Sequence, residues 1–241
     1  MEKRSPKFGI VKFVFLALYF VILTTERVIS LIACFTAGFS EFDALDYYMV
    51  SLTVLSIVCA YIFGAVQIVK YKKTEKLFGR LAVAAGILLF GGMVHTDGTI
   101  PGIQFASYGM ILVSMAVHTL QSVKEQGGTV AKWLAFAYTV AYSMSIPVVY
   151  HTGISLAYLF IPIEVIVSAG MVVMFTIMLK RFYDCGGENR FSPCPLIAAL
   201  VGDVLVLALR WQEEINAFVL IFICVTTVLW AVGKAVCSRK K

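Results

Sequence analysis

The feature that most constrains this chain is a series of apolar runs, each about as long as a helix that crosses a bilayer. Such a helix needs about 20 largely apolar residues, and 60% of the 241 residues are hydrophobic. We therefore predict an all-α, polytopic membrane protein that forms a single domain of eight transmembrane helices over residues 1–241. The predicted spans are residues 10–33, 47–69, 81–96, 101–121, 133–150, 154–179, 194–209 and 215–233.

The distribution of basic residues predicts how these spans are oriented. The N-terminus and the connectors after the second, fourth, sixth and eighth runs hold nearly all the Lys and Arg, whereas the other connectors hold almost none apart from Arg210. Because Lys and Arg in short loops favour the cytosolic side, we expect both termini to be cytosolic. The net charge of +6 then reflects membrane topology rather than nucleic-acid binding. We expect a multi-pass protein of the cell membrane, and nothing in the sequence specifies an oligomeric state.

The histidines do not form a metal-binding pattern. Zinc requires ligands within about 2.0–2.2 Å of one point. His95 and His151 fall at the outer ends of their spans, whereas His118 falls near the inner end of the fourth span, about 25–30 Å along the membrane normal from Asp97. The sequence contains no His-Glu-x-x-His motif and no Gly-x-Ser-x-Gly motif. We therefore expect no metal, no other cofactor and no serine-hydrolase mechanism.

Carboxylates inside the apolar runs are the candidates for acid–base chemistry. Asp203 lies near the middle of the seventh run, and Asp97 lies at the outer end of the third. Glu164 lies near the middle of the sixth run, two residues after Pro162. A charge at bilayer depth costs about 2.5–3.5 kcal/mol on insertion scales, so such groups usually face the interior of the helix bundle. Burial favours the protonated carboxylic acid, which can act as a general acid while a better-solvated carboxylate acts as a base.

Each of these carboxylates also has a structural interpretation. Asp203 is equally well explained as a hydrogen-bonding group between helices. Asp97 is explained as an interfacial turn residue before Gly98, and Glu164 as a cap for the helix irregularity at Pro162.

Other polar residues in the runs leave similar alternatives open. Glu26 and Arg27, in the second half of the first run, form either a buried ion pair or a snorkelling helix end. Tyr138 and Tyr142, one helical turn apart, are expected to be packing residues. The third run is rich in Gly and Ala, which let helix backbones approach closely in lipid.

Short motifs surround the candidate aspartates. Asp97 is followed 21 positions later by His118, with Tyr108-Gly109 between them. Asp203 stands in the series Gly202-Asp203, Leu205, Leu207-Ala208 and Arg210-Trp211. Together with the stretch 162–174, this pattern resembles the lysoplasmalogenase-like YhhN family of eight-span membrane proteins. Thr96, Gly202 and Gln121 depart from the family pattern.

The resemblance implies that a lysoplasmalogen, a lipid, is the substrate, and that its vinyl-ether bond is hydrolysed without a metal to a fatty aldehyde and a glycerophospho-alcohol. The reaction needs a proton on the alkene carbon and water on the resulting oxocarbenium ion. We expect Asp203 to be the acid and Asp97 the water-orienting base or cation stabiliser, or the reverse. Glu164 is a further catalytic candidate that would act through these two. The candidates for substrate binding are Arg210, Tyr108 and His118.

Two other classes of function fit the same residues. Glu164 and Asp203, with Pro162 interrupting a helix, also suit a proton-coupled transporter of small solutes. A transporter often shows repeat symmetry between its halves, and the first four and last four runs show no convincing correspondence. The remaining alternative is a non-catalytic membrane protein, for which Asp203→Leu should be tolerated.

Overall fold

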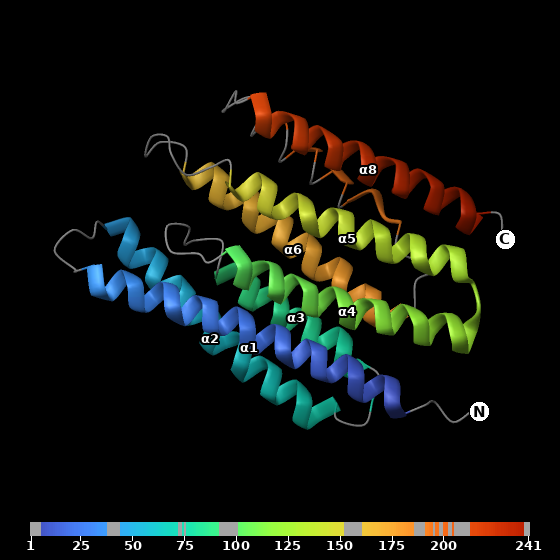
Figure 1. Ribbon diagram of the computed structural model, residues 1–241, viewed down its shortest axis with the longest axis horizontal. Helices are drawn as coiled ribbons and strands as arrows, with labels where there is room; N and C mark the ends of the chain where they lie inside the picture. The colour runs from blue at the N-terminus through green and yellow to red at the C-terminus, as the bar shows by residue number, and fades with distance from the viewer. Residues whose placement is uncertain are drawn as a thin grey trace. The chain divides into compact units, whose positions relative to one another are not determined.

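The computed structural model consists of helices throughout the part of the chain that it describes (Figure 1). The helices are α1 (Pro6–Ala37), α2 (Ala44–Tyr71), α3 (Lys76–Gly91), α4 (Pro101–Gln126), α5 (Thr129–His151), α6 (Ile161–Cys185) and α8 (Glu213–Ser238). The structure describes residues 6–37, 44–71, 74, 76–91, 101–151, 161–185, 191–194, 196–197, 200–201, 204 and 213–238. Over these residues the predicted all-α class is confirmed.

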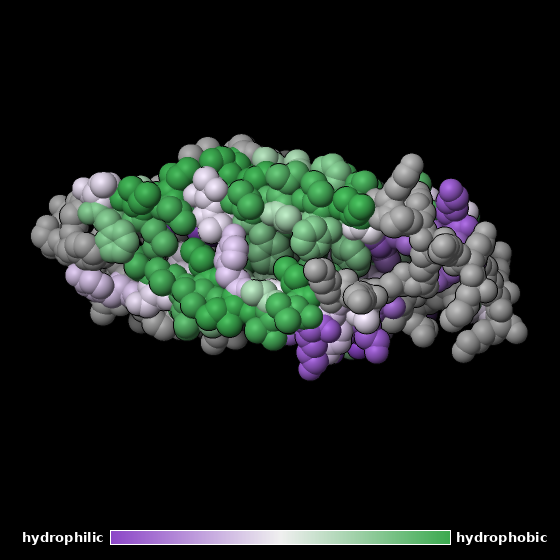
Figure 2. All heavy atoms as spheres, turned by 90° about the horizontal axis from the view of Figure 1, so that it is seen from below, coloured by the Kyte–Doolittle hydropathy of each residue, from purple (hydrophilic) through white to green (hydrophobic). Residues whose placement is uncertain are grey.

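Several of these helices have the dimensions and composition of membrane spans. Within the described residues, three stretches are long and apolar enough to cross a bilayer, namely Gly9–Ala33 in α1, Val50–Tyr71 in α2 and Leu220–Ser238 in α8. Among the residues coloured in Figure 2, hydrophobic side chains cover most of the face that is drawn. These are features of a membrane protein.

Helix α2 shows the arrangement most clearly, because its apolar residues face outward and its small and polar residues face inward. The buried set recurs at helical spacing and comprises Thr53, Ser56, Ala60, Gly64 and Gln67. The exposed set occupies the other face and includes Val54, Leu55, Val58, Tyr61, Ile62 and Val66. Such an inverted helix is unfavourable in water but is stable in lipid, where small residues promote close helix packing.

The break between α4 and α5 follows from two glycines. Gly127 and Gly128 have φ angles of 71° and 74°, a left-handed conformation that other residues adopt only at a cost. The Gly127 amide donates to the Val123 carbonyl at 2.9 Å and so caps the end of α4. The predicted interruption at Gly127-Gly128 is confirmed.

The chain forms two compact units, residues Met1–His118 and Thr119–Lys241, and the boundary falls within α4. We call them the N-terminal unit and the C-terminal unit. In the N-terminal unit, α2 packs most extensively against α3, and α1 packs against both. Gly64 of α2 lies at this contact, where a Cβ at its position would meet the Cβ of Ala84 in α3 at 3.8 Å, an ordinary van der Waals distance. The alanines of α3 at positions 82, 84 and 85 are buried, in agreement with the close packing expected from this Gly- and Ala-rich run.

In the C-terminal unit, α5 packs against α8 and α6 and runs antiparallel to both (Figure 1). The segment from Phe191 to Cys194 is fixed against these helices. Trp230 in α8 donates its indole N–H to the Phe191 carbonyl at 3.1 Å, and Tyr138 in α5 donates its hydroxyl to the Ser192 carbonyl at 3.2 Å. The Phe191 ring lies 5.7 Å from the Tyr138 ring, centroid to centroid.

Candidate functional site

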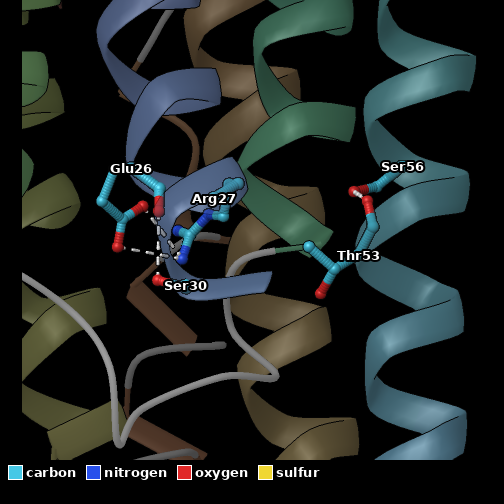
Figure 3. Close-up of polar contacts among 5 residues, drawn as sticks. All are labelled: Glu26, Arg27, Ser30, Thr53 and Ser56. Carbon is cyan, nitrogen blue, oxygen red and sulfur yellow. Dashed lines mark hydrogen bonds and ion pairs between the residues drawn. The ribbon is translucent and has the colours of Figure 1, made fainter. Parts of the chain in front are cut away.

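A buried ion pair lies inside the first membrane-spanning stretch. Arg27 Nη1 is 3.2 Å from Glu26 Oε2, and the two side chains are only 4% and 1% exposed. Figure 3 shows the guanidinium and the carboxylate turned toward each other, with the hydroxyl of Ser30 beside them. Of the two interpretations left open by the sequence, the structure selects the buried pair and excludes the snorkelling helix end.

Neutral polar side chains of α1 and α2 are also buried in the N-terminal unit. Ser30 donates its hydroxyl to the Glu26 carbonyl at 3.0 Å, one turn back along α1. From α2, Thr53 and Ser56 are both buried, and Ser56 donates to the Thr53 carbonyl at 2.8 Å (Figure 3). A hydrogen-bonding group beside a buried ion pair, such as the Ser30 hydroxyl, lowers the free-energy cost of keeping charge away from water.

Two tyrosines lie within electrostatic range of the same pair. Tyr108, in α4, interacts with the charges of both Arg27 and Glu26. Tyr19, on α1 and almost fully buried, interacts with Tyr108 and with Arg27. We call Glu26, Arg27, Ser30, Tyr19 and Tyr108 the polar cluster. It combines a carboxylate, a guanidinium and hydroxyls, which are groups that bind phosphate or sugar-like oxygens.

A second buried polar group lies nearer the N-terminus of α1. The Lys12 side chain is 4% exposed, and its Nζ lies 3.4 Å from Nδ1 of His118 in α4 and 4.5 Å from the ring centroid of Phe78 in α3. The hydroxyl of Ser114 donates to the Lys12 carbonyl at 3.2 Å. Since Lys12 and Glu26 are 14 positions apart, they are separated by about 21 Å along the helix.

The described residues place only some of the side chains predicted from the sequence. Asp97, Asp203 and Arg210 lie outside the described residues. Glu164 belongs to α6, but its side chain is likewise outside the description. These residues therefore remain predictions.

The predicted substrate-binding residues Tyr108 and His118 lie on the same helix but at different depths. They are ten positions apart on α4, which corresponds to about 15 Å. Tyr108 belongs to the polar cluster, whereas His118 contacts Lys12. The structure therefore does not bring these two side chains together.

Sequence reasoning did not single out Lys12. A lysine near the end of an apolar run is usually explained by snorkelling to the interface. Only the tertiary contacts with His118 and Phe78 show that Lys12 is buried.

Among the described side chains, no group of three or more His, Cys, Asp and Glu could hold a metal ion. Comparison with known protein families, with curated proteins and with solved structures gives no match to this chain. The functional argument therefore depends on the residues themselves.

Proposed function

We propose that the protein is an eight-span membrane enzyme, with both termini cytosolic, that hydrolyses the vinyl-ether bond of lysoplasmalogens. The choice of reaction rests on the motifs around Asp97 and Asp203. The choice of an intramembrane site rests on one observation, the burial of Glu26 and Arg27 inside a helix that is apolar and long enough to cross the bilayer.

The burial of this pair is informative because it carries a free-energy cost. Removing two charges from water costs several kcal/mol per ion, and their attraction repays that cost only with good geometry and further hydrogen bonds. A pair of leucines at the same positions would avoid the cost in lipid. Charged residues within membrane spans therefore mark functional sites by default.

In the proposed reaction, Asp203 delivers a proton to the alkene carbon of the vinyl ether. The resulting oxocarbenium ion takes up water, whose proton passes to Asp97. The hemiacetal then breaks its bond to the glycerol oxygen, which takes the proton from Asp97 and leaves as the glycerophospho-alcohol. The hemiacetal hydroxyl gives its proton to Asp203 as the fatty chain leaves as the aldehyde, so both carboxyl groups return to their starting states. A carboxylate beside the cation also stabilises its charge.

The polar cluster supplies the binding part of this proposal. Arg27, oriented by Glu26 at 3.2 Å, binds the phosphate of the head group. Arg210 stays a substrate-binding candidate from the sequence. Tyr108 donates a hydrogen bond to an oxygen of the glycerol backbone. Glu164 supports the catalytic carboxylates. We leave His118 out of the binding set, because it is about 15 Å along α4 from Tyr108.

The test uses purified full-length protein in detergent, incubated with a lysoplasmalogen and, separately, with the corresponding acyl lysophospholipid. We expect fatty aldehyde from the first lipid and no fatty acid from the second. Asp203→Asn and Asp97→Asn should each lower aldehyde release by about 10²–10⁴-fold, the usual contribution of a general acid or base. Asp184→Asn is the matched control, because Asp184 is an exposed carboxylate that pairs with Lys180 at 2.6 Å. Full activity in both Asn variants would end the proposal.

A proton-coupled carrier is favoured by a different observation, namely that α1 carries two buried polar groups at different depths, one at Lys12 and one at Glu26. Protein reconstituted in liposomes distinguishes the two functions. A carrier would move protons with a solute across the liposome membrane without releasing aldehyde, and the enzyme would release aldehyde without moving protons.

A further inference from the structure

The C-terminal unit contains a cavity of about 180 Å³ between α5, α6 and the segment that follows α6. One wall is apolar and is made by Met174, Ile177 and Met178 of α6. The other lining groups are polar and include Arg181 at the last turns of α6, Thr139 of α5 and Ser192. The cavity is therefore amphipathic, with a cation at one end and a thioether and aliphatic surface beside it.

The cation in this cavity has no counter-charge among the described residues. The neighbouring Lys180 pairs with Asp184, one helical turn further on, at 2.6 Å. Arg181 is exposed and forms no ion pair or hydrogen bond with any residue that the structure describes. Its guanidinium can therefore present several N–H donors to an anion.

The wall opposite α6 is held in place. The Ser192 carbonyl accepts a hydrogen bond from Tyr138, and the carbonyl of Phe191 accepts one from Trp230. The Thr139 hydroxyl donates to the Ala135 carbonyl at 2.8 Å, so its oxygen has a fixed direction. A preformed wall lowers the entropic cost of binding a ligand.

We propose that this cavity binds an anionic phospholipid of the surrounding bilayer, with the lipid phosphate on Arg181 and the first part of an acyl chain against Met174, Ile177 and Met178. Charge complementarity selects the anionic head group. The volume accommodates part of a lipid, so the remaining chain stays in the bilayer. In the proposed topology this end of α6 faces the cytosolic leaflet, where anionic lipids concentrate. The site shares no residue with the polar cluster and does not depend on the proposed hydrolysis.

The experiment is native mass spectrometry of the full-length protein incubated with detergent-solubilised dioleoylphosphatidylglycerol or dioleoylphosphatidylcholine. We expect wild-type protein to retain phosphatidylglycerol in preference to phosphatidylcholine. Arg181→Gln should lower that retention about tenfold or more, because a charge-assisted contact is lost. Ile177→Trp should lower it by filling the cavity. Lys180→Gln is the matched control, since it removes an adjacent cation that is already paired, and it should retain the lipid.

Three outcomes would overturn the inference. Arg181→Gln could retain phosphatidylglycerol as wild type does, Lys180→Gln could lose it equally, or phosphatidylcholine could be retained as well as phosphatidylglycerol. A further measurement separates the lipid from a free anion. If excess inorganic phosphate alone displaces the bound phosphatidylglycerol, the site is an anion site and not a lipid site. Aldehyde release by Arg181→Gln should equal that of wild type, so this result is independent of the proposed enzymatic function.

Discussion

The two units of this protein differ in the charged groups that their described residues bury. Among the described residues, the N-terminal unit encloses the Glu26–Arg27 ion pair within a membrane-spanning helix. Both units pack aromatic rings, such as Phe20 against Tyr61 with centroids 6.1 Å apart in the N-terminal unit and Phe191 against Tyr138 at 5.7 Å in the C-terminal unit. Aromatic packing and the hydrogen bonds of Tyr138 and Trp230 stabilise the C-terminal unit, whose described residues hold no buried ion pair.

The buried lysine of the C-terminal unit sharpens this contrast. Lys132 is 2% exposed, but its ammonium group donates to the Ser122 carbonyl at 2.6 Å and to the Gln126 side chain at 3.2 Å. Both partners lie at the end of α4, so Lys132 holds the α4–α5 turn together. Glu26 and Arg27 lie in mid-helix, where no turn needs such support. On this difference we interpret Lys132 as structural, and we propose a functional role for the polar cluster.

The largest expected effect comes from breaking the ion pair. Glu26→Gln leaves the Arg27 guanidinium buried without its carboxylate, and removal of one partner of a buried pair costs about 3–5 kcal/mol. We expect a marked fall in the midpoint of unfolding. Circular dichroism in detergent measures this midpoint during heating or during titration with dodecyl sulfate. Glu125→Gln, on the exposed side of α4, is the control and should change the midpoint little. An unchanged midpoint for Glu26→Gln would remove the contrast between the two units.

A smaller effect is expected in the C-terminal unit at Gly233, where α8 approaches Phe191 so closely that a Cβ would overlap the ring. Overpacking of this kind costs about 1–3 kcal/mol, so Gly233→Ala should lower the same unfolding midpoint. Gly170→Ala in α6 is the matched control, because a Cβ there meets no atom within 4 Å. It should be neutral or stabilising by up to about 1 kcal/mol, because alanine favours helix. Adding Phe191→Leu to Gly233→Ala should restore part of the lost stability, because the smaller side chain leaves room for the Cβ. If Gly233→Ala and Gly170→Ala had the same unfolding midpoint, the proposed packing would be contradicted.

Local patterns in the sequence were sufficient to predict much of the fold. The apolar runs predict α1, α2 and α8, because a helix in lipid needs only length and apolar surface. Gly127-Gly128 predicts the end of α4, because left-handed backbone favours glycine. The depth of Glu26 and Arg27 also follows from their position in the first run. The full set of eight crossings and their orientation stay predictions.

Contacts between segments distant in sequence were not predictable in the same way. The choice between a buried pair and a snorkelling pair at Glu26–Arg27 depends on which face of α1 packs against other helices. The sequence of α1 alone does not contain that information. The burial of Lys12 depends on His118, 106 positions away. The close approach of Gly233 to Phe191 likewise links an α8 glycine to a segment that follows α6.

The central claim is that the Glu26–Arg27 pair serves binding and catalysis rather than stability. The most direct measurement is aldehyde release from a lysoplasmalogen by the double variant Glu26→Leu/Arg27→Met, compared with its unfolding midpoint. Replacing a whole buried pair by hydrophobic residues is often neutral or stabilising by about 1–4 kcal/mol, so the double variant should unfold at or above the wild-type midpoint. Its aldehyde release should fall by about 10²-fold, because the substrate loses its positioning group. A folded double variant with wild-type aldehyde release would contradict the claim.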